Sequence, residues 1–164
     1  MEAETIATRR LTLLPLAPRH AEEMAGVLGD PRLHLYIGGA PQTAEQLRAR
    51  YERLVAGSGD AAVSWCNWVV RLDEADRLTG TVQATVTGER AEVAWVVGTA
   101  WQGRGIATEA ARGLVGWLHG RGVTTVVAHV HPRHAASAAV AAAAGFTATD
   151  EWQDGEIRWR SVIG

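Results

Sequence analysis

The chain of 164 residues is 47% hydrophobic and 21% charged, and its 16 arginines against 18 aspartates and glutamates give a formal net charge of −2. A general nucleic-acid binder is expected to carry a basic excess, so this balance argues against DNA or RNA as a partner. The single cysteine, Cys66, leaves no pair for an internal disulfide and no thiolate set for a structural metal site.

A chain of this length fits one compact domain, which we expect to span residues 8–162 behind a short flexible N-terminus of residues 1–7. Residues 1–5 are acidic and lack the apolar core of a secretory signal. No run approaches the roughly 18 apolar residues of a membrane span. We therefore expect a cytoplasmic protein that works without a membrane, and a homodimer is compatible with these features.

Turn residues and apolar spacing predict the elements of the first half of the chain. Thr43 followed by Gln46 is the capping-box pattern of a helix start, and glycines at 57 and 59 end the same helix. The expected elements are a strand at 10–16, a helix at 18–28, a short helix or turn at 33–37, a helix at 43–56, and strands at 65–72, 78–87 and 91–98. Short polar turns separate the last three strands, which indicates an antiparallel meander.

The pattern changes after residue 98. Ile106, Ala110 and Leu114 recur at helical spacing and predict a helix that ends near Gly120. Beyond it we expect a β-branched strand at 123–130, a helix at 135–144, and two strands that start at 146 and 156. This order predicts an α/β (α+β) domain whose sheet is antiparallel at first and later gains a crossover strand.

The segment Gln102-Gly103-Arg104-Gly105-Ile106-Ala107 joins the third meander strand to the following helix. A helix N-terminus leaves several backbone N–H groups unpaired and carries partial positive charge, which suits a phosphate or pyrophosphate. Gly103 and Gly105 let the backbone approach an anion without a Cβ, and Arg104 adds a formal positive charge. Taken alone, the segment is equally compatible with a tight turn.

Two familiar phosphate loops do not fit this segment. A Walker A loop requires Gly-Lys-Ser/Thr, which the sequence lacks. A dinucleotide fingerprint requires a third Gly or Ala at the position where this chain has Thr108. The whole motif must also follow the first strand of a βαβ unit, with an acidic residue about 20 positions further on. The segment instead follows three antiparallel strands, and the next strand, at 123–130, ends without an acid.

Three stretches in order carry a family resemblance. Residues 102–107 match a Q/R-x-x-G-x-G/A motif, residues 91–97 look like the strand before it, and residues 131–137 with Gly145-Phe146 are similar to a V-x-P-x-N-x-x-S…G-F stretch. Through them the chain, from about residue 8 to 160, resembles the GNAT superfamily of N-acetyltransferases, particularly its ribosomal-protein (RimJ/RimL-like) branch. The resemblance implies a GNAT fold: a mixed, mostly antiparallel sheet of about six to seven strands, about four helices and a central, splayed pair of parallel strands.

The resemblance also implies acetyl-CoA as the acyl-donor cosubstrate and an amine as the acceptor. The backbone amides of seven consecutive residues would hold the pyrophosphate: Gln102, Gly103, Arg104, Gly105, Ile106, Ala107 and Thr108. Val96, Val97 and Gly98 would hydrogen-bond the pantetheine arm, which enters between the splayed strands near Val96 and near residues 127–129. A backbone N–H there would stabilise the thioester oxyanion while a primary amine attacks directly in a ternary complex.

Glu92 matches the catalytic glutamate of some relatives and is the candidate general base. Only a neutral amine is nucleophilic, and deprotonating a lysine-like amine at neutral pH costs about 4–5 kcal/mol, against about 1 kcal/mol for an α-amine. A carboxylate that acts through water therefore matters more for a lysine-like acceptor. The alternative is that Glu92 is a charged residue on an exposed strand face, paired with Arg90 or with an arginine opposite it.

The candidate acid for the leaving CoA thiolate is Ser137. The tyrosine that many relatives use falls at Ala141 here, whereas Ser137 matches the serine of the ribosomal-protein branch. The alternative for Ser137 is a serine at a helix N-terminus that bonds to backbone. His134 stands where relatives have asparagine, so its imidazole either takes over the hydrogen bond to the pantetheine or loop backbone, or that contact is absent.

Two other functions stay open at the level of sequence. His129 and His131 share one strand face and His134 follows them, so the three could ligate zinc. The stretch has no metal role in relatives, however, and we expect no metal site. A GNAT-like module that binds acyl-CoA without transferring it, as a sensor would, is the second alternative. The acceptor, a protein N-terminus or a small amine, is not identified by the sequence.

Overall fold

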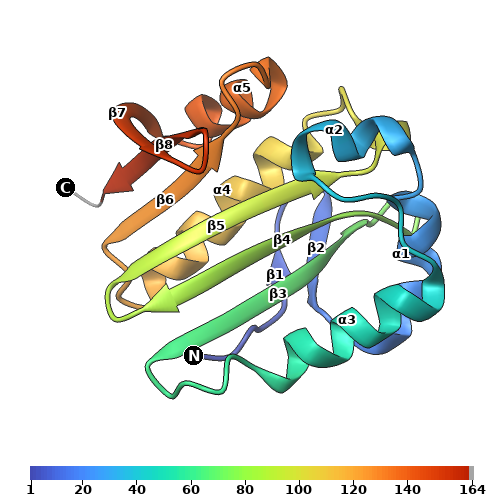
Figure 1. The fold of residues 1–164 in the computed structure, drawn as a ribbon. Coiled ribbons are helices and arrows are strands. Elements are labelled where there is room, and N and C mark those ends of the chain that lie inside the picture. The colour runs from blue at the N-terminus through green and yellow to red at the C-terminus, as the bar shows by residue number, and fades with distance from the viewer. Residues whose placement is uncertain (163–164) are drawn as a thin grey trace.

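The computed structural model describes residues 1–162, which form one eight-stranded sheet in the order β1-β2-β3-β4-β5-β6-β8-β7 (Figure 1). The strands are β1 (Ile6–Ala7), β2 (Leu11–Pro15), β3 (Val63–Leu72), β4 (Arg77–Thr87), β5 (Arg90–Val97), β6 (Thr125–Val130), β7 (Thr147–Gln153) and β8 (Glu156–Val162). The α-helices are α1 (Ala21–Val27), α2 (His34–Ile37), α3 (Ala44–Ala56), α4 (Ile106–Gly120) and α5 (Ala135–Ala143). Single turns of 3-10 helix lie at Pro18–His20, Pro31–Leu33 and Thr99–Trp101.

The expected fold class is confirmed, because the sheet is mixed, mostly antiparallel, and contains the central parallel pair β5 and β6. It has one strand more than expected, β1, which lies within the segment 1–7 that we expected to be a flexible N-terminus. In the structure Ile6 pairs with Leu13 and is buried, and the Trp68 indole donates to the Glu4 carbonyl at 2.7 Å. A two-residue strand is too short to leave a periodic signal in the sequence.

The helix starts follow the local chemistry of the sequence. Thr43 caps α3: its Oγ1 accepts from the Gln46 N–H at 3.1 Å, and the Gln46 Oε1 accepts from the Thr43 N–H at 3.0 Å. This is the reciprocal bonding that a capping box predicts. The short segment before it forms α2, which ends at Gly38 with a φ of 81°. Among residues 1–162, no helix is both long enough and apolar enough to cross a bilayer.

Apolar side chains cover both faces of the sheet. On one face, α4 packs Leu114 and Leu118 against buried strand residues such as Trp68. On the other, Met24 of α1 and Leu47 of α3 pack against Val69. Figure 1 shows α4 behind the strands, with α2 and α3 on the near side. The site described below lies on the near side, between α2 and β8.

The parallel strands β5 and β6 diverge towards their carboxyl ends. They pair from Arg90 with Thr125 to Val93 with Ala128, after which β5 continues to Val97 without pairing to β6. The end of β5 instead stays against β4, where Gly80 allows a close approach: a Cβ there would lie 2.2 Å from the Val96 carbonyl oxygen. The predicted splayed pair is therefore present.

Candidate active site

A cavity of about 450 Å³ lies where β5 and β6 diverge. Residues 94–96 of β5 and 128–130 of β6 form its walls at this end. The lining also includes Leu28, which follows α1, and Leu47 and Tyr51 of α3. A cavity of this size, lined by both apolar and polar side chains, is suited to a small ligand or to the tip of a chain.

The loop from β5 to α4 presents a set of free backbone donors. Among residues 1–162, no backbone carbonyl accepts a hydrogen bond from the N–H groups of 103–108, and the first bond of α4 runs from the Glu109 N–H to the Gly105 carbonyl at 3.1 Å. Gly103 and Gly105 have φ values of 79° and 75°, in the left-handed region that disfavours other residues. Such a row of N–H groups at the start of a 15-residue helix is an anion-binding arrangement.

Two arginines contact this loop, and one of them, Arg104, adds positive charge to it. The Arg104 guanidinium lies over the Trp101 ring, 5.0 Å from its centroid, which holds it beside the loop. Arg10, immediately before β2, donates from Nη1 to the Arg104 carbonyl at 2.9 Å. Arg10 is a residue that the sequence did not indicate, because it lies 94 positions from its partner and belongs to no local motif.

The loop is also tied to the end of β5. The Gln102 side-chain amide donates to the Val97 carbonyl at 3.0 Å, and the Gly98 N–H donates to Thr79 of β4 at 2.8 Å. Strand hydrogen bonds alternate in direction, so the backbone groups of Val96 and Gly98 point towards β4 and those of Val97 point into the gap between β5 and β6. Of these three backbone positions, Val97 is therefore the one that faces the gap.

Glu92 lies on β5, opposite Val127 of β6, one position before the last pair of the two strands. Its Oε1 is 2.9 Å from the Nδ1 atom of His129, which lines the cavity. The ion pairs of residues 1–162 include none between Glu92 and an arginine, so the expected alternative of a direct arginine partner is not found. The Glu92 side chain is 51% exposed and lies beside the cavity rather than in its lining.

Ser137 and His134 lie at the start of α5, and both line the cavity with Val96. Among the hydrogen bonds of residues 1–162, none involves the Ser137 hydroxyl, so the alternative of a serine bonded to helix backbone is not observed. The His134 ring stacks on Tyr36 of α2, with centroids 4.2 Å apart and planes 8° apart. Burial, with a smaller contribution from the charge of nearby His131, lowers the pKa of His134.

The histidines are not arranged as metal ligands. No group of three His, Cys, Asp or Glu side chains within residues 1–162 is placed to hold a metal ion. The two ring nitrogens of His129 contact Glu92 and Arg158, and His131 lies edge-on to Tyr36 at 5.4 Å. The structure thus brings Val96, His134 and Ser137 together in the cavity, while the anion-binding loop lies outside its lining, beyond the end of β5.

Comparison with known proteins identifies the family to which this arrangement belongs. Residues 10–147 match the family model described as the acetyltransferase (GNAT) domain. The chain belongs to the GNAT acetyltransferase family. This confirms the family that the three sequence stretches predicted. No curated protein matches the sequence significantly.

Solved GNAT structures share the whole architecture. A RimL ribosomal L7/L12 alpha-N-protein acetyltransferase in complex with coenzyme A is similar with a TM-score of 0.83, 17% identity and coverage of 98% of each chain. The microcin C7 self-immunity acetyltransferase MccE, in complex with acetyl-CoA and AMP, is similar with a TM-score of 0.79 and 19% identity, over 95% of this chain and 94% of that one. The ribosomal-protein-S5-alanine acetyltransferase from Vibrio fischeri is similar with a TM-score of 0.76 and 20% identity, over 97% of this chain and 96% of that one. At these identities the likeness shows the GNAT fold alone.

Glu109, in the first turn of α4, anchors the anion-binding loop of this GNAT domain. It accepts hydrogen bonds from the Arg10 N–H at 2.8 Å, from Arg10 Nε at 2.7 Å and from the Thr8 hydroxyl at 2.5 Å. Burial by itself raises the pKa of Glu109, but the hydrogen bonds from Thr8 and Arg10 outweigh it and hold the pKa below its ordinary value. Sequence motifs gave no sign of this anchor.

We expect Glu109→Gln to lower the free energy of unfolding by about 1–2 kcal/mol at neutral pH, because charged hydrogen bonds are replaced by weaker ones. The folded pKa of Glu109 is lowered, so its contribution is present above the unfolded pKa of about 4.3 and is lost as pH falls through the folded value. The wild type should therefore lose more stability on acidification than the variant. Urea unfolding at a series of pH values measures both effects.

Glu45→Gln is the matched control, since Glu45 is an exposed glutamate in the first turn of α3. We expect it to change stability by less than about 0.5 kcal/mol. An identical pH dependence for the wild type and Glu109→Gln would contradict the role assigned to this carboxylate.

Proposed function

We propose that the protein is an acetyl-CoA-dependent N-acetyltransferase that transfers the acetyl group to a primary amine within one ternary complex. The observation that carries this proposal is the row of free N–H groups at 103–108, next to the point where β5 and β6 open onto a cavity. An anion site and a strand gap at one end of the sheet suit a donor with a pyrophosphate and an extended arm.

The backbone N–H groups of residues 103–108 would hold the pyrophosphate, with Arg104 supplying positive charge. The Gln102 N–H already donates to the Thr99 carbonyl at 3.4 Å, so Gln102 would act through its side chain, which holds the loop against Val97. The Val97 N–H faces the gap and would bond the pantetheine arm. Val96 and Gly98 would flank the arm, because their own backbone groups point towards β4. His134, stacked on Tyr36, would border the arm instead of donating the amide hydrogen bond of the usual asparagine.

In the transfer itself, Glu92 would accept a proton from the ammonium of the acceptor, through water, so that the neutral nitrogen attacks the thioester carbonyl carbon. A new C–N bond forms and the C–S bond breaks. Ser137, whose hydroxyl makes no hydrogen bond among residues 1–162 and lines the cavity, would give its proton to the departing thiolate and regain one from solvent. A backbone N–H at the strand gap would stabilise the intermediate oxyanion.

The size of the cavity limits which amines can act as the acceptor. One of the similar structures is named as an alpha-N-protein acetyltransferase, a second is named for an alanine of a ribosomal protein, and the third is an immunity acetyltransferase solved with AMP. A cavity of about 450 Å³ is large enough for a terminal residue or a small amine, but not for a folded surface. We therefore propose an α-amine of a peptide end or a compact small-molecule amine as the acceptor.

Release of free CoA thiol in the presence of an amine panel tests the proposal. The panel contains peptides with N-terminal serine or alanine, a blocked lysine, a polyamine and an aminoglycoside. We expect thiol release above background hydrolysis with at least one amine, together with the acetylated product in mass spectrometry. Binding of acetyl-CoA without thiol release for any amine would favour the sensor alternative and contradict the enzyme.

A further inference from the structure

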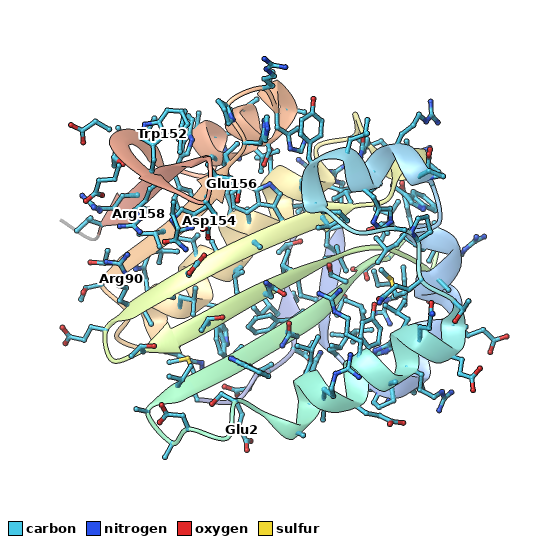
Figure 2. The ribbon with its side chains drawn as sticks, in the orientation of Figure 1. Glu2, Arg90, Trp152, Asp154, Glu156 and Arg158 are labelled. Atoms are coloured by element: carbon cyan, nitrogen blue, oxygen red, sulfur yellow. The ribbon has the colours of Figure 1, made fainter. Side chains whose placement is uncertain are left out.

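A row of three side chains crosses the strands beside the cavity: Glu92 on β5, His129 on β6 and Arg158 on β8. The His129 Nδ1 is 2.9 Å from the Glu92 Oε1, and the Arg158 Nε donates to the His129 Nε2 at 3.1 Å. His129 and Arg158 are direct partners in the antiparallel ladder of β6 and β8. Figure 2 shows Arg158 on β8, with Glu156 of the same strand closer to the turn.

The arginine decides which nitrogen of His129 carries the proton. A guanidinium only donates hydrogen bonds, so the Nε2 atom that receives the Arg158 bond has no proton. The ring hydrogen must then lie on Nδ1, where it points at the Glu92 carboxylate. His129 is therefore a donor to Glu92, with its orientation and its tautomer both set by Arg158.

Arg158 is itself held in place from the β7 side. Its Nη2 donates to the Gln153 side-chain oxygen at 2.9 Å, and its Nη1 lies 3.8 Å from the Glu151 carboxylate. The His129 side chain is only 8% exposed and that of Arg158 20%, whereas Glu92 is 51% exposed. The shielded His129 thus bonds one oxygen of the exposed Glu92 carboxylate, and no group within residues 1–162 hydrogen-bonds the other oxygen, Oε2.

We propose that His129 and Arg158 are positioning residues that hold Glu92 for its role as the base, an inference that rests on the proposed function. Both ring nitrogens of His129 are occupied, so the imidazole does not take the proton of the amine. Glu92 takes that proton at Oε2 and returns it to solvent, while His129 keeps its own Nδ1 hydrogen. The contact removes side-chain freedom that a surface glutamate otherwise retains.

Two substitutions of His129 separate this role from simple packing. His129→Leu removes the donor, and we expect kcat to fall about tenfold near neutral pH, with the KM for acetyl-CoA unchanged. His129→Asn places a side-chain N–H close to the position of Nδ1 and should restore most of the loss. The deficit of His129→Leu should shrink as pH rises, because the amine then loses its proton without help from Glu92.

Arg158→Met should also lower kcat several-fold, since it frees Nε2 and lets the ring hydrogen leave Nδ1. Arg71→Met is the matched control: Arg71 is a strand arginine that also pairs with a carboxylate, that of Asp73 at 3.2 Å, but it lies on β3, three strands from β6. We expect it to leave kcat unchanged.

Wild-type kcat in His129→Leu, alongside a large loss in Glu92→Gln, would overturn the positioning role and leave the base assignment intact. Equal losses of kcat in His129→Leu and His129→Asn at every pH would also overturn it, because the losses would then come from packing and not from the missing hydrogen-bond donor. Wild-type activity in Glu92→Gln would show that Glu92 is not the base, and His129 and Arg158 would then have no base to position. A thermal shift with acetyl-CoA for each variant confirms that it is folded and binds the donor.

Discussion

Replacing Gly105 with valine is expected to raise the KM for acetyl-CoA by about 100-fold, equivalent to about 2.7 kcal/mol of lost donor binding. Gly105 is the N-cap of α4 and has a left-handed φ of 75°. A β-branched residue strongly disfavours that conformation, so the loop must leave it. The free N–H groups of 103–108 would then be rearranged, and the anion site would be lost.

Gly88→Val separates this effect from general strain. Gly88 lies in the turn between β4 and β5, has a φ of 60°, and leaves open space for a Cβ. Both variants should therefore lose a similar amount of stability, about 1–2 kcal/mol. Only Gly105→Val should lose affinity for acetyl-CoA, which steady-state kinetics and isothermal titration measure. Equal donor affinity in the two variants would rule out the loop as the pyrophosphate site.

Glu92→Gln is expected to lower kcat/KM by about 100-fold near pH 7 for a lysine-like acceptor. The loss should be smaller for an α-amine, because deprotonating it at neutral pH costs only about 1 kcal/mol. It should also shrink as pH rises, since the amine then supplies its own neutral form. A pH series of kcat/KM from about pH 6 to about pH 9 with both types of acceptor measures these differences.

Glu89→Gln is the matched control for the loss of one negative charge, because Glu89 is exposed in the turn between β4 and β5, three positions before Glu92. It should leave the pH profile unchanged. A flat ratio of wild-type to Glu92→Gln activity across the whole pH range would show that Glu92 is not the base.

Local patterns predicted most of the fold. The capping box at Thr43, the glycine-bounded turns and the helical spacing from Ile106 placed α3, the meander and α4 close to their observed bounds. These features depend on residues that are neighbours in sequence, so their physical signal is local. The strand β1 escaped detection because two residues carry no period.

The candidate site was predictable only where a motif is contiguous. The loop at 102–108 and the stretch with His134 and Ser137 were identified, and the structure places the latter two at the cavity. The anchoring of Glu109 by Arg10 spans 99 positions, and the contacts of His129 span 37 positions to Glu92 and 29 to Arg158. Such contacts follow from strand order and register, which the sequence pattern alone does not specify.

We propose that this GNAT domain binds acetyl-CoA through the loop before α4. Thermal unfolding with and without acetyl-CoA tests this proposal most directly. At a concentration of about 100 times Kd, a ligand that binds only the folded state adds about 2.7 kcal/mol to the free energy of unfolding. For a chain of this size, that gain raises Tm by about 5–10 °C. We expect that rise for the wild type and for Gly88→Val, and a much smaller one for Gly105→Val. No rise for the wild type at millimolar acetyl-CoA would contradict the account.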